Sequence, residues 1–394
     1  MPLNPAFERN GISIITSEPF PPLGPPGADV VCLIGTAPDK HASVQYNVPV
    51  RIANSGHWRL IDSTGDERGS LIHAIMKTHE QTQVVIYAIV VEEGADFDAT
   101  TANIIGGRDP TTNQRLGIAA ARECTERPTI IAAPGFSHQK AVIDQMAAMG
   151  AVMRARVVAD GLSTTPEEQI AFLETLGGEG SNYDRVYMVE PAVSIYSRKA
   201  RGDILVPASV VAVGALASVK QWESPGNQSL PINGTAHTIE YGIMDETSEA
   251  NLLQKYGCAV ICHTSMGGWS LIGNRTVTGK FISYVGLEDA ICRKLEETSQ
   301  RYMAKNMTKS FWDQTIRRIN GFLKDLIASE IIPGGEVYLH PELNTASRYQ
   351  NGSWYIVFDY GRYAPNEHMI YHVNAKEKYV EEYLENVLGE QANG

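Results

Sequence analysis

The chain has 394 residues, of which 43% are apolar and 20% are charged. This composition is that of a folded globular protein, and it excludes a largely disordered chain and a fibrous one. At roughly 100–200 residues per domain, the length predicts two or three domains. The 33 basic and 45 acidic residues give a formal net charge of −12. We therefore expect no direct nucleic-acid binding, because contacts to phosphates need clustered Lys and Arg.

The cysteines and the first residues indicate the compartment. Five scattered cysteines in a chain of this size do not predict a disulfide framework. Residues 1–5 lack the basic and apolar regions of a signal peptide. The longest apolar run, residues 84–91, has eight residues, whereas a transmembrane helix needs about 20. We expect a chain that folds in a reducing cytoplasm, with no signal peptide and no membrane insertion.

An arm and a stiff tether are predicted for residues 1–27. A short β-type run is followed by five prolines within residues 19–26, and such a segment favours the extended polyproline II conformation. At ~3.1 Å per residue, residues 17–27 span about 35 Å. A tethered strand favours pairing with the sheet edge of another chain, but a strand packed on its own domain is equally open. The run is Gly11, Ile12, Ser13, Ile14, Ile15 and Thr16.

Strands and helices alternate over residues 28–265, which predicts an α/β domain with a mostly parallel sheet. The apolar and small residues of 206–219 suit a helix packed closely on that sheet. The expected strands cover residues 28–35, 84–91, 128–134, 152–159 and 186–189. The other expected helices cover residues 69–79, 166–176 and a segment from a capping Ser137 to Met149.

An α+β core domain is predicted for residues 266–365. Helices are expected over residues 287–305 and 309–329, and the second has apolar residues at spacings of three and four, which is typical of an amphipathic helix. Strands are expected over residues 336–339 and 354–358. The pair Asn351-Gly352 between them predicts a hairpin-type turn.

A C-terminal arm is predicted for residues 366–394. A strand is expected over residues 367–373, where apolar side chains alternate as in a half-buried strand. Asn374 and Glu377 form a capping-box pattern at the start of a final helix. Gly389 is the expected stop of that helix, directly after Leu388.

No motif in the sequence predicts catalysis or metal binding. There is no G-x-x-x-x-G-K-[ST] loop, and no G-x-G-x-x-G follows the first strand. Ser137 lies in a sequence that fails the G-x-S-x-G pattern at its last position. Cys258 and Cys262, if they lie on a strand, are about 13 Å apart at ~3.3 Å per residue, too far to share one zinc. We predict no catalytic residue, no metal and no cofactor; the alternative is a cytoplasmic α/β enzyme with an unrecognised site.

The charge is unevenly distributed along the chain. Residues 275–324 contain ten basic and five acidic residues, a balance of +5 that leaves −17 for the remaining chain. The pattern is that of a solvated helical face or of a docking surface for an acidic partner. The basic residues are Arg275, Lys280, Arg293, Lys294, Arg301, Lys305, Lys309, Arg317, Arg318 and Lys324.

Collinear motifs over residues 130–373 resemble the sheath proteins of contractile phage tails and of R-type bacteriocins. Residues 127–137 resemble the family's strand and "APGFS" turn, and residues 205–227 resemble its "VPPS…AG…W.SPAN" stretch. Residues 257–277 resemble its "GIN.I…WG.RT" region, with Asn274 in place of Ala. Gly352 and residues 365–367 resemble its "G…PAE" pattern, with Asn366 in place of Ala.

The resemblance implies a structural protein without enzymatic activity. Members of the family form hexameric rings that stack into a helical sheath around an inner tube, and the sheath contracts to drive the tube through a host envelope. The implied partners are further copies of the chain, the tail tube protein, and baseplate and tail terminator proteins. The implied location is the virion, after assembly in the host cytoplasm.

The resemblance also implies strand-exchange arms at both ends. Family members exchange N- and C-terminal strands with neighbouring subunits, and such strand addition keeps a sheath connected while its subunits reorient. Residues 11–16 are the expected N-terminal strand. The expected C-terminal strand consists of Met369, Ile370, Tyr371, His372 and Val373.

A sheath needs one surface that faces its tube, and we expect this surface on the basic helical region. Weak, exposed ion pairs would release during contraction. The best candidates cluster around the junction of the two predicted helices: Lys305, Lys309, Arg317 and Arg318.

Overall fold

The computed structural model describes residues 27–176, 182–264, 268–300 and 302–392. The chain divides into two compact units, one that ends at Ala364 and one that begins at Pro365. The expected N-terminal strand, residues 11–16, and the proline-rich tether lie outside the described residues, so both stay predictions.

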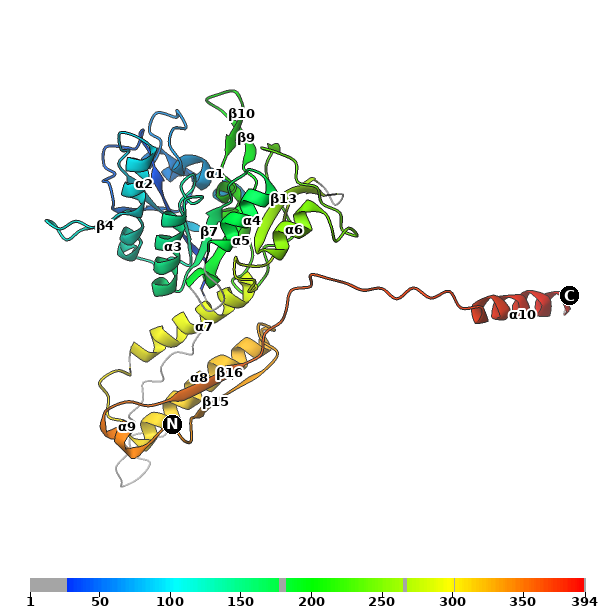
Figure 1. Ribbon diagram of the computed structural model, residues 1–394. Coiled ribbons are helices and arrows are strands. Elements are labelled where there is room, and N and C mark those ends of the chain that lie inside the picture. The colour runs from blue at the N-terminus through cyan, green and yellow to red at the C-terminus, as the bar shows by residue number, and fades with distance from the viewer. Residues whose placement is uncertain (1–26, 177–181, 265–267, 301, 393–394) are drawn as a thin grey trace, which may run out of the picture. The chain divides into compact units, whose positions relative to one another are not determined.

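A nine-stranded sheet forms the centre of the first unit (Figure 1). Its strands are β1 (Val30–Thr36), β2 (Pro49–Ile52), β3 (Val85–Val91), β6 (Ile130–Ala132), β7 (Arg156–Asp160), β8 (Val186–Glu190), β11 (Gln228–Ser229), β13 (Cys258–Thr264) and β14 (Gly268–Ile272). Their order is β11-β14-β13-β8-β7-β6-β1-β3-β2. The strands from β13 to β3 in this order are parallel, and the others are antiparallel to their neighbours. The sheet continues through β14, beyond residue 265.

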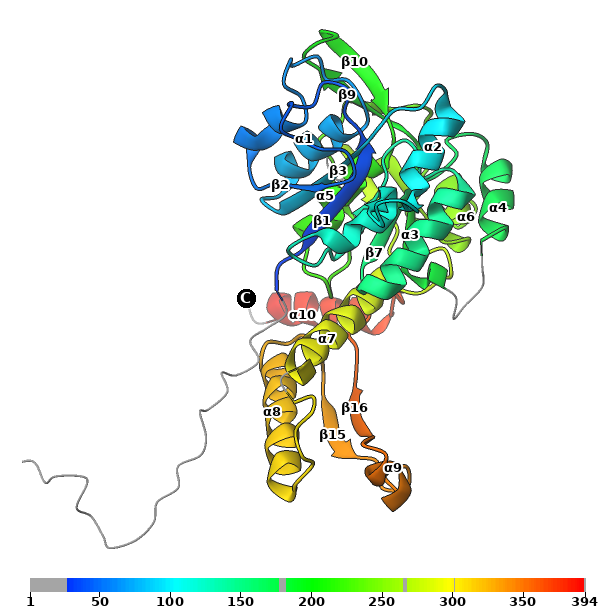
Figure 2. The same cartoon turned by 90° about the vertical axis from the view of Figure 1, so that its left-hand side faces the viewer.

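Helices cover both faces of this sheet (Figure 2). An apolar cluster fills the space between sheet and helices on each side, so the central strands are apolar on both faces, as in buried parallel sheets. The predicted α/β fold is confirmed. One face carries α1 (Leu71–Gln81) and α5 (Ser209–Ser218); the other carries α2 (Phe97–Ile105), α3 (Lys140–Met153), α4 (Pro166–Glu174) and α6 (Glu249–Lys255).

Helix α5 is the expected helix of small apolar residues. Its residues from Ser209 to Leu216 are all buried, because α1 packs on it as well as the sheet. It has ten residues, about half of what a bilayer requires. Within the described ranges, none of the helices combines the length and apolarity needed to cross a membrane.

The start of α3 differs from the sequence prediction. Ser137 does not cap the helix, which begins at Lys140. The buried Ser137 hydroxyl instead donates to the Asp160 carboxylate (2.6 Å), and a hydrogen bond to a buried charge is stronger than one to a neutral, exposed amide. The helix also continues to Met153, so β7 begins at Arg156 and not at residue 152 as expected.

The α/β domain also contains smaller strands and helices outside the nine-stranded sheet. A three-stranded antiparallel sheet has the order β10-β9-β12, and a short hairpin joins β4 to β5. Three 3-10 helices lie in the connections. These elements are β4 (Gly107–Arg108), β5 (Arg115–Leu116), β9 (Val193–Ser197), β10 (Gly202–Val206), β12 (Gly234–Thr235), η2 (Ser55–Leu60), η3 (Gly117–Glu123) and η4 (Asn182–Arg185).

The remainder of the first unit is an α+β part, as predicted. Helix α8 packs the apolar side chains of Phe322, Leu323 and Leu326 against a two-stranded sheet. Thr308 caps α8 and accepts a hydrogen bond from the Phe311 amide (3.2 Å). The elements are α7 (Ile282–Gln300), α8 (Lys309–Ala328), β15 (Gly335–Leu339), α9 (Ala346–Gln350) and β16 (Ile356–Tyr360).

The connection between β15 and β16 is not the predicted tight turn. Asn351 is the C-cap of α9, and Gly352 follows it with φ at 73°. A left-handed Gly ends helices as readily as it forms hairpin turns. The Asn-Gly pair therefore does mark a change in chain direction, but this change is the end of α9 and not a hairpin turn.

The second unit consists of an irregular segment and one helix. Residues 365–376 form no strand within the chain, so the strand expected over 367–373 is absent from the single subunit. Helix α10 (Lys378–Ala392) begins after the expected capping box at Asn374 and continues through Gly389, so both predicted ends were wrong. One glycine costs only about 0.5–1 kcal/mol in a helix interior, which is too little to end this helix.

Candidate assembly surfaces

The turn at residues 133–137 joins three elements around one carboxylate. Asp160, at the end of β7, accepts hydrogen bonds from the Ser137 hydroxyl (2.6 Å) and the Gly135 amide (3.3 Å). Its other oxygen accepts from the Ser209 amide (2.7 Å) in the first turn of α5, where a negative charge complements the helix dipole. Because Ser137 is completely buried, it is a structural residue and is not accessible as a nucleophile.

The cysteines on β13 are also structural. Cys258 and Cys262 lie on a strand, as the zinc argument assumed, and both are buried. Burial raises the pKa of the Cys262 thiol to about 11 and raises that of Cys258 as well, so both stay protonated at neutral pH. In the part of the chain that the structure describes, no group of three or more His, Cys, Asp or Glu side chains could hold a metal ion.

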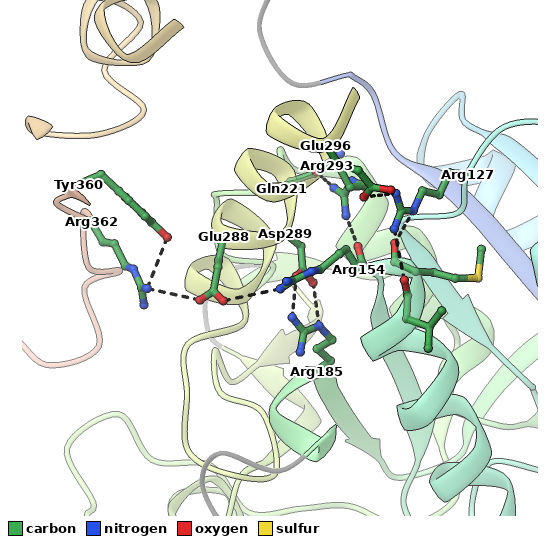
Figure 3. Close-up of polar contacts among 12 residues, drawn as sticks. Arg127, Arg154, Arg185, Gln221, Glu288, Asp289, Arg293, Glu296, Tyr360 and Arg362 are labelled. Atoms are coloured by element: carbon green, nitrogen blue, oxygen red, sulfur yellow. Dashed lines mark hydrogen bonds and ion pairs between the residues drawn. The ribbon is translucent and has the colours of Figure 1, made fainter. Parts of the chain in front are cut away.

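Arginine contacts hold helix α7 against the α/β domain, as Figure 3 shows. Arg185 donates two hydrogen bonds to Asp289 (3.0 and 2.7 Å), whose side chain is only 1% exposed. Farther along the helix, Arg127 pairs with Glu296 (2.7 Å). The two contacts lie about two helical turns apart, so together they fix the direction of α7 relative to the sheet.

Two further arginines complete this junction (Figure 3). Arg293 donates to the Gln221 side chain and to the carbonyl oxygen of Arg154. Burial lowers the pKa of Arg293 to about 10, so it stays charged at neutral pH. Arg362, just after β16, pairs with Glu288 (3.4 Å). Helix α7 is therefore bound by side chains from both parts of the first unit.

The first described residues are anchored firmly in the α/β domain. Arg156 donates to both carboxylate oxygens of Asp29 (2.8 Å each), and neither side chain is more than 3% exposed. Thr129 donates to the same carboxylate (2.6 Å). Gln221 donates to the carbonyl oxygen of Gly27 (3.0 Å). Gly27, the first described residue, is therefore held at a fixed point of the domain.

The β15–β16 sheet has one free edge on each strand. Its order contains these two strands and no other described strand. The Gly361 amide donates to the Gly334 carbonyl oxygen (2.9 Å). These two residues lie opposite each other, so they are a hydrogen-bonded pair of the antiparallel register. Because hydrogen-bonded and non-hydrogen-bonded pairs alternate, the backbone groups of Val337 on β15 and Phe358 on β16 face outward. Each edge can accept one added strand.

The second unit exposes most of its large apolar side chains. The expected arm residues Ile370, Tyr371 and Val373 are 74–90% exposed. On α10, apolar residues recur at helical spacing and form one stripe that is also exposed. Within the described part of this unit nothing covers the stripe, and exposed apolar surface of this kind marks an interaction site. The stripe consists of Tyr379, Val380, Tyr383, Leu384 and Leu388.

The four basic residues expected to face a tube lie close together in the sequence, around the start of α8. Lys305 lies in the α7–α8 connection, and the others lie on α8. Lys305, Lys309 and Arg317 are exposed. Arg318 is half-buried and donates to the Tyr302 hydroxyl (3.3 Å), so it is partly engaged within its own subunit.

The basic excess of residues 275–324 is smaller at the surface than the count predicts. Lys280 pairs with Asp184 (2.7 Å), Arg293 is buried in the α7 junction, and Lys294 pairs with Glu297 (3.2 Å). Lys280 and Arg293 thereby join separate segments of the subunit, and Lys294 pairs within its own helix. Around the start of α8, Lys305, Lys309 and Arg317 remain exposed.

Sequence reasoning missed the α7 junction and the Asp29–Arg156 pair. Their partners lie 104 and 127 residues apart in the chain, so no local pattern connects them. One feature of the sequence pointed to the junction: Asp289 lies four residues after Val285 and three before Cys292, so it shares one face of α7 with apolar residues. A charge in that position needs a buried partner.

The chain is similar to two curated tail sheath proteins, although no family model matches it. It is 27% identical over 374 residues to a prophage major tail sheath protein of Pseudomonas aeruginosa (strain UCBPP-PA14), covering 91% of this chain and 94% of that protein. It is 24% identical over 300 residues to the tail sheath protein of Burkholderia phage BcepMu, covering 71% of this chain and 63% of the relative.

The fold is similar to solved sheaths of contractile injection systems. The sheath of the extracellular contractile injection system PVC, in its contracted state, matches with a TM-score of 0.66 at 13% identity, over 94% of this chain and 99% of that one. The contracted helical sheath of the anti-feeding prophage (AFP) matches with a TM-score of 0.66 at 17% identity, over 93% and 99%. At these identities, the structures establish the fold.

Proposed function

Since the chain belongs to the family of contractile tail sheath proteins, we propose that it polymerises as stacked hexameric rings around an inner tube. Contraction of the stack would drive the tube through a host envelope. The observation that carries this proposal is the match of sheath relatives along nearly the whole chain. The chemistry of the motifs supports the same conclusion, because Ser137, Cys258 and Cys262 serve the fold and are buried.

The β15–β16 sheet is the proposed acceptor of the two arms. It has two free edges, and the chain has two candidate arm strands, residues 11–16 and 369–373. An added strand forms main-chain hydrogen bonds whatever its side chains are. Its alternating side chains then determine the register of the pairing. An arm strand that pairs with the sheet edge of another copy connects the two subunits. Exchange of arms between copies would therefore link neighbouring subunits.

The first unit is proposed to move as one body during contraction. The arginine contacts on α7 bind the α/β domain and the C-terminal core to one helix. Subunits that reorient without internal rearrangement keep their cores intact, and flexible arms preserve the connections. The work of contraction would then come from contacts between subunits.

The surface around the start of α8 is the proposed contact with the tube. Lys305, Lys309 and Arg317 are exposed, and an exposed ion pair contributes only about 0–1 kcal/mol. Repetition over many subunits makes the sum large, while each contact stays weak enough to release. Replacing Lys305, Lys309, Arg317 and Arg318 with Glu should impair co-assembly with the tube and leave the fold intact, and added salt should weaken docking of the parent chain. A sheath map with these side chains on its outer surface would overturn this assignment.

Baseplate and tail terminator proteins are the proposed partners at the ends of the stack. A solved AFP baseplate contains a chain with this fold, at a TM-score of 0.65 and 17% identity. The proposed location of the chain is the tail of the assembled particle, after assembly in the host cytoplasm.

Electron microscopy and size-exclusion chromatography of the purified full chain test the proposed function. We expect rings or hollow cylinders and a broad, high-mass elution profile. A chain that lacks residues 1–20 should fold and elute as a monomer, because it lacks one arm strand. A small oligomer of fixed size for the full chain, or normal cylinders from the truncated one, would contradict the proposal.

A further inference from the structure

A cleft of about 1110 Å³ lies where the α/β domain meets the C-terminal core of the first unit. The α/β domain contributes the loop before β3 and the segment after α5, and the opposite wall comes from the start of α7, the end of α8 and the chain after β16. Its lining includes Ser218, Trp222, Tyr284, Ile331 and Tyr363. The cleft therefore combines aromatic rings with polar groups.

Three aromatic side chains in the cleft have unused hydrogen-bond donors. The indole N–H of Trp222 and the hydroxyls of Tyr284 and Tyr363 donate to no other residue in the described part of the chain. Two of the rings have a cation beside them: the Lys220 ammonium lies 5.8 Å from the Trp222 ring centre, and the Arg362 guanidinium lies 5.2 Å from that of Tyr284. Aromatic rings with free N–H and O–H donors are the groups that bind polyproline II segments, whose carbonyl oxygens have no internal partner.

A segment of this composition joins the chain at the cleft itself. Gly27 lines the cleft, and its carbonyl oxygen is held by Gln221 (3.0 Å). The ten residues before it, 17–26, include Pro19, Pro21, Pro22, Pro25 and Pro26. Because this segment is attached at the cleft, docking is intramolecular, and the effective concentration of a short linked segment is on the order of millimolar. Even a weak site would therefore be substantially occupied.

We propose that the proline-rich tether, residues 17–26, docks in this cleft of its own chain. Each prolyl ring packs on an aromatic side chain without a large loss of conformational entropy, because proline is already restricted. Docking fixes where the strand of residues 11–16 leaves the subunit. Undocking would extend the reach of that strand by up to about 31 Å at ~3.1 Å per residue. The cleft thereby controls the length of the arm.

Hydrogen exchange of the full chain tests this proposal at a concentration where light scattering shows a monomer. The comparison is with a full-length variant in which the five tether prolines are replaced by Ser. We expect amides of residues 220–223 and 329–331 to exchange about tenfold faster in the variant, because docking no longer protects them. A chain without residues 1–16 keeps the tether and should exchange like the parent. Equal exchange in parent and proline variant would overturn the proposal.

Two exposed tyrosines give a matched pair of further variants. Tyr363 is 52% exposed and lines the cleft, whereas Tyr196 is 57% exposed and lies on β9, outside it. Tyr363→Ala should speed exchange at residues 220–223, and Tyr196→Ala should not. Protection that grows with protein concentration would instead assign the cleft to a second copy's tether and overturn docking in the same chain. The measurement uses monomers, so it is independent of whether the chain forms a sheath.

Discussion

Helices α5 and α10 differ in the exposure of their apolar side chains: those of α5 are buried, and those of α10 are exposed. In α5, the residues from Ser209 to Leu216 are buried between α1 and the sheet. In α10, Tyr379, Tyr383 and Leu388 are 64–65% exposed. The first unit buries apolar clusters between its own helices and strands, and it pairs buried charges such as Asp29 and Arg156. The second unit has a stripe of apolar side chains that nothing in the described part of that unit covers, and we expect this stripe to form a contact in the assembly.

Asp29→Ala should cause the largest loss of stability, because it breaks a buried ion pair of the first unit. The change leaves Arg156 buried without its partner, and breaking a buried ion pair typically costs about 3–5 kcal/mol. Urea denaturation followed by circular dichroism measures the free energy of unfolding. Arg51→Ala is the control, since its ion pair with Glu126 is 48% and 43% exposed and such exposed pairs contribute little to stability. Equal losses for the two variants would contradict the account.

Glu190→Gln should have the next largest effect, and it should stabilise the protein. Burial raises the pKa of Glu190 to about 7 from the ordinary value of 4.5, and its Oε2 has no hydrogen-bond partner within the described residues. Between these pH values the folded chain keeps a proton that the unfolded chain loses. The free energy of unfolding therefore falls from pH 4.5 to about pH 7, by up to about 3 kcal/mol, and is level above that.

The measurement for Glu190 is the difference in the free energy of unfolding between variant and parent as a function of pH. The Gln side chain does not ionise, so the variant should gain about 2–3 kcal/mol over the parent at pH 8 and little at pH 4. Glu126→Gln, which makes the same change at a side chain that is 43% exposed, is the control. A difference that does not change with pH would show that Glu190 titrates normally.

Charges placed on the α10 stripe should leave stability almost unchanged and abolish assembly. For Leu384→Glu with Leu388→Glu, we expect a change within about 0.5 kcal/mol, as for other surface substitutions. Sedimentation velocity should nevertheless show monomers in place of large particles. Glu382→Gln with Glu385→Gln, on the opposite face of the same helix, should assemble normally. Assembly of the Leu variant at the parent's level would mean that the stripe takes no part in an assembly contact.

A single proline in the arm strand should weaken assembly at one of two adjacent positions and should leave the stability of the first unit unchanged. A strand added at a sheet edge donates from every second amide only, so Met369→Pro and Ile370→Pro should differ. One of the two removes a ladder hydrogen bond and weakens assembly, whereas the other is tolerated. Neither should alter the unfolding of the first unit. Identical and normal assembly of both variants would argue against strand pairing at residues 369–373.

The sequence predicted the elements of the first unit better than those of the C-terminal segment. Alternating strands and helices, and the stripe on α8, follow from apolar patterns that the chain satisfies by itself. The end of α3, the role of Ser137 and the α7 junction depend on contacts between distant residues such as Arg185 and Asp289, which no local pattern contains. The strand at residues 367–373 is a different case, because a strand needs a neighbour to pair with, and these residues pair with no strand among the described residues.

A cryo-electron microscopy map of the assembled chain tests the central claim most directly. The account predicts that residues 369–373 of one copy lie as an added strand along a free edge of the β15–β16 sheet in a neighbouring copy, and that the stripe of α10 is covered. A map in which both edges stay unpaired, or in which residues 369–373 return to their own subunit, would contradict the account.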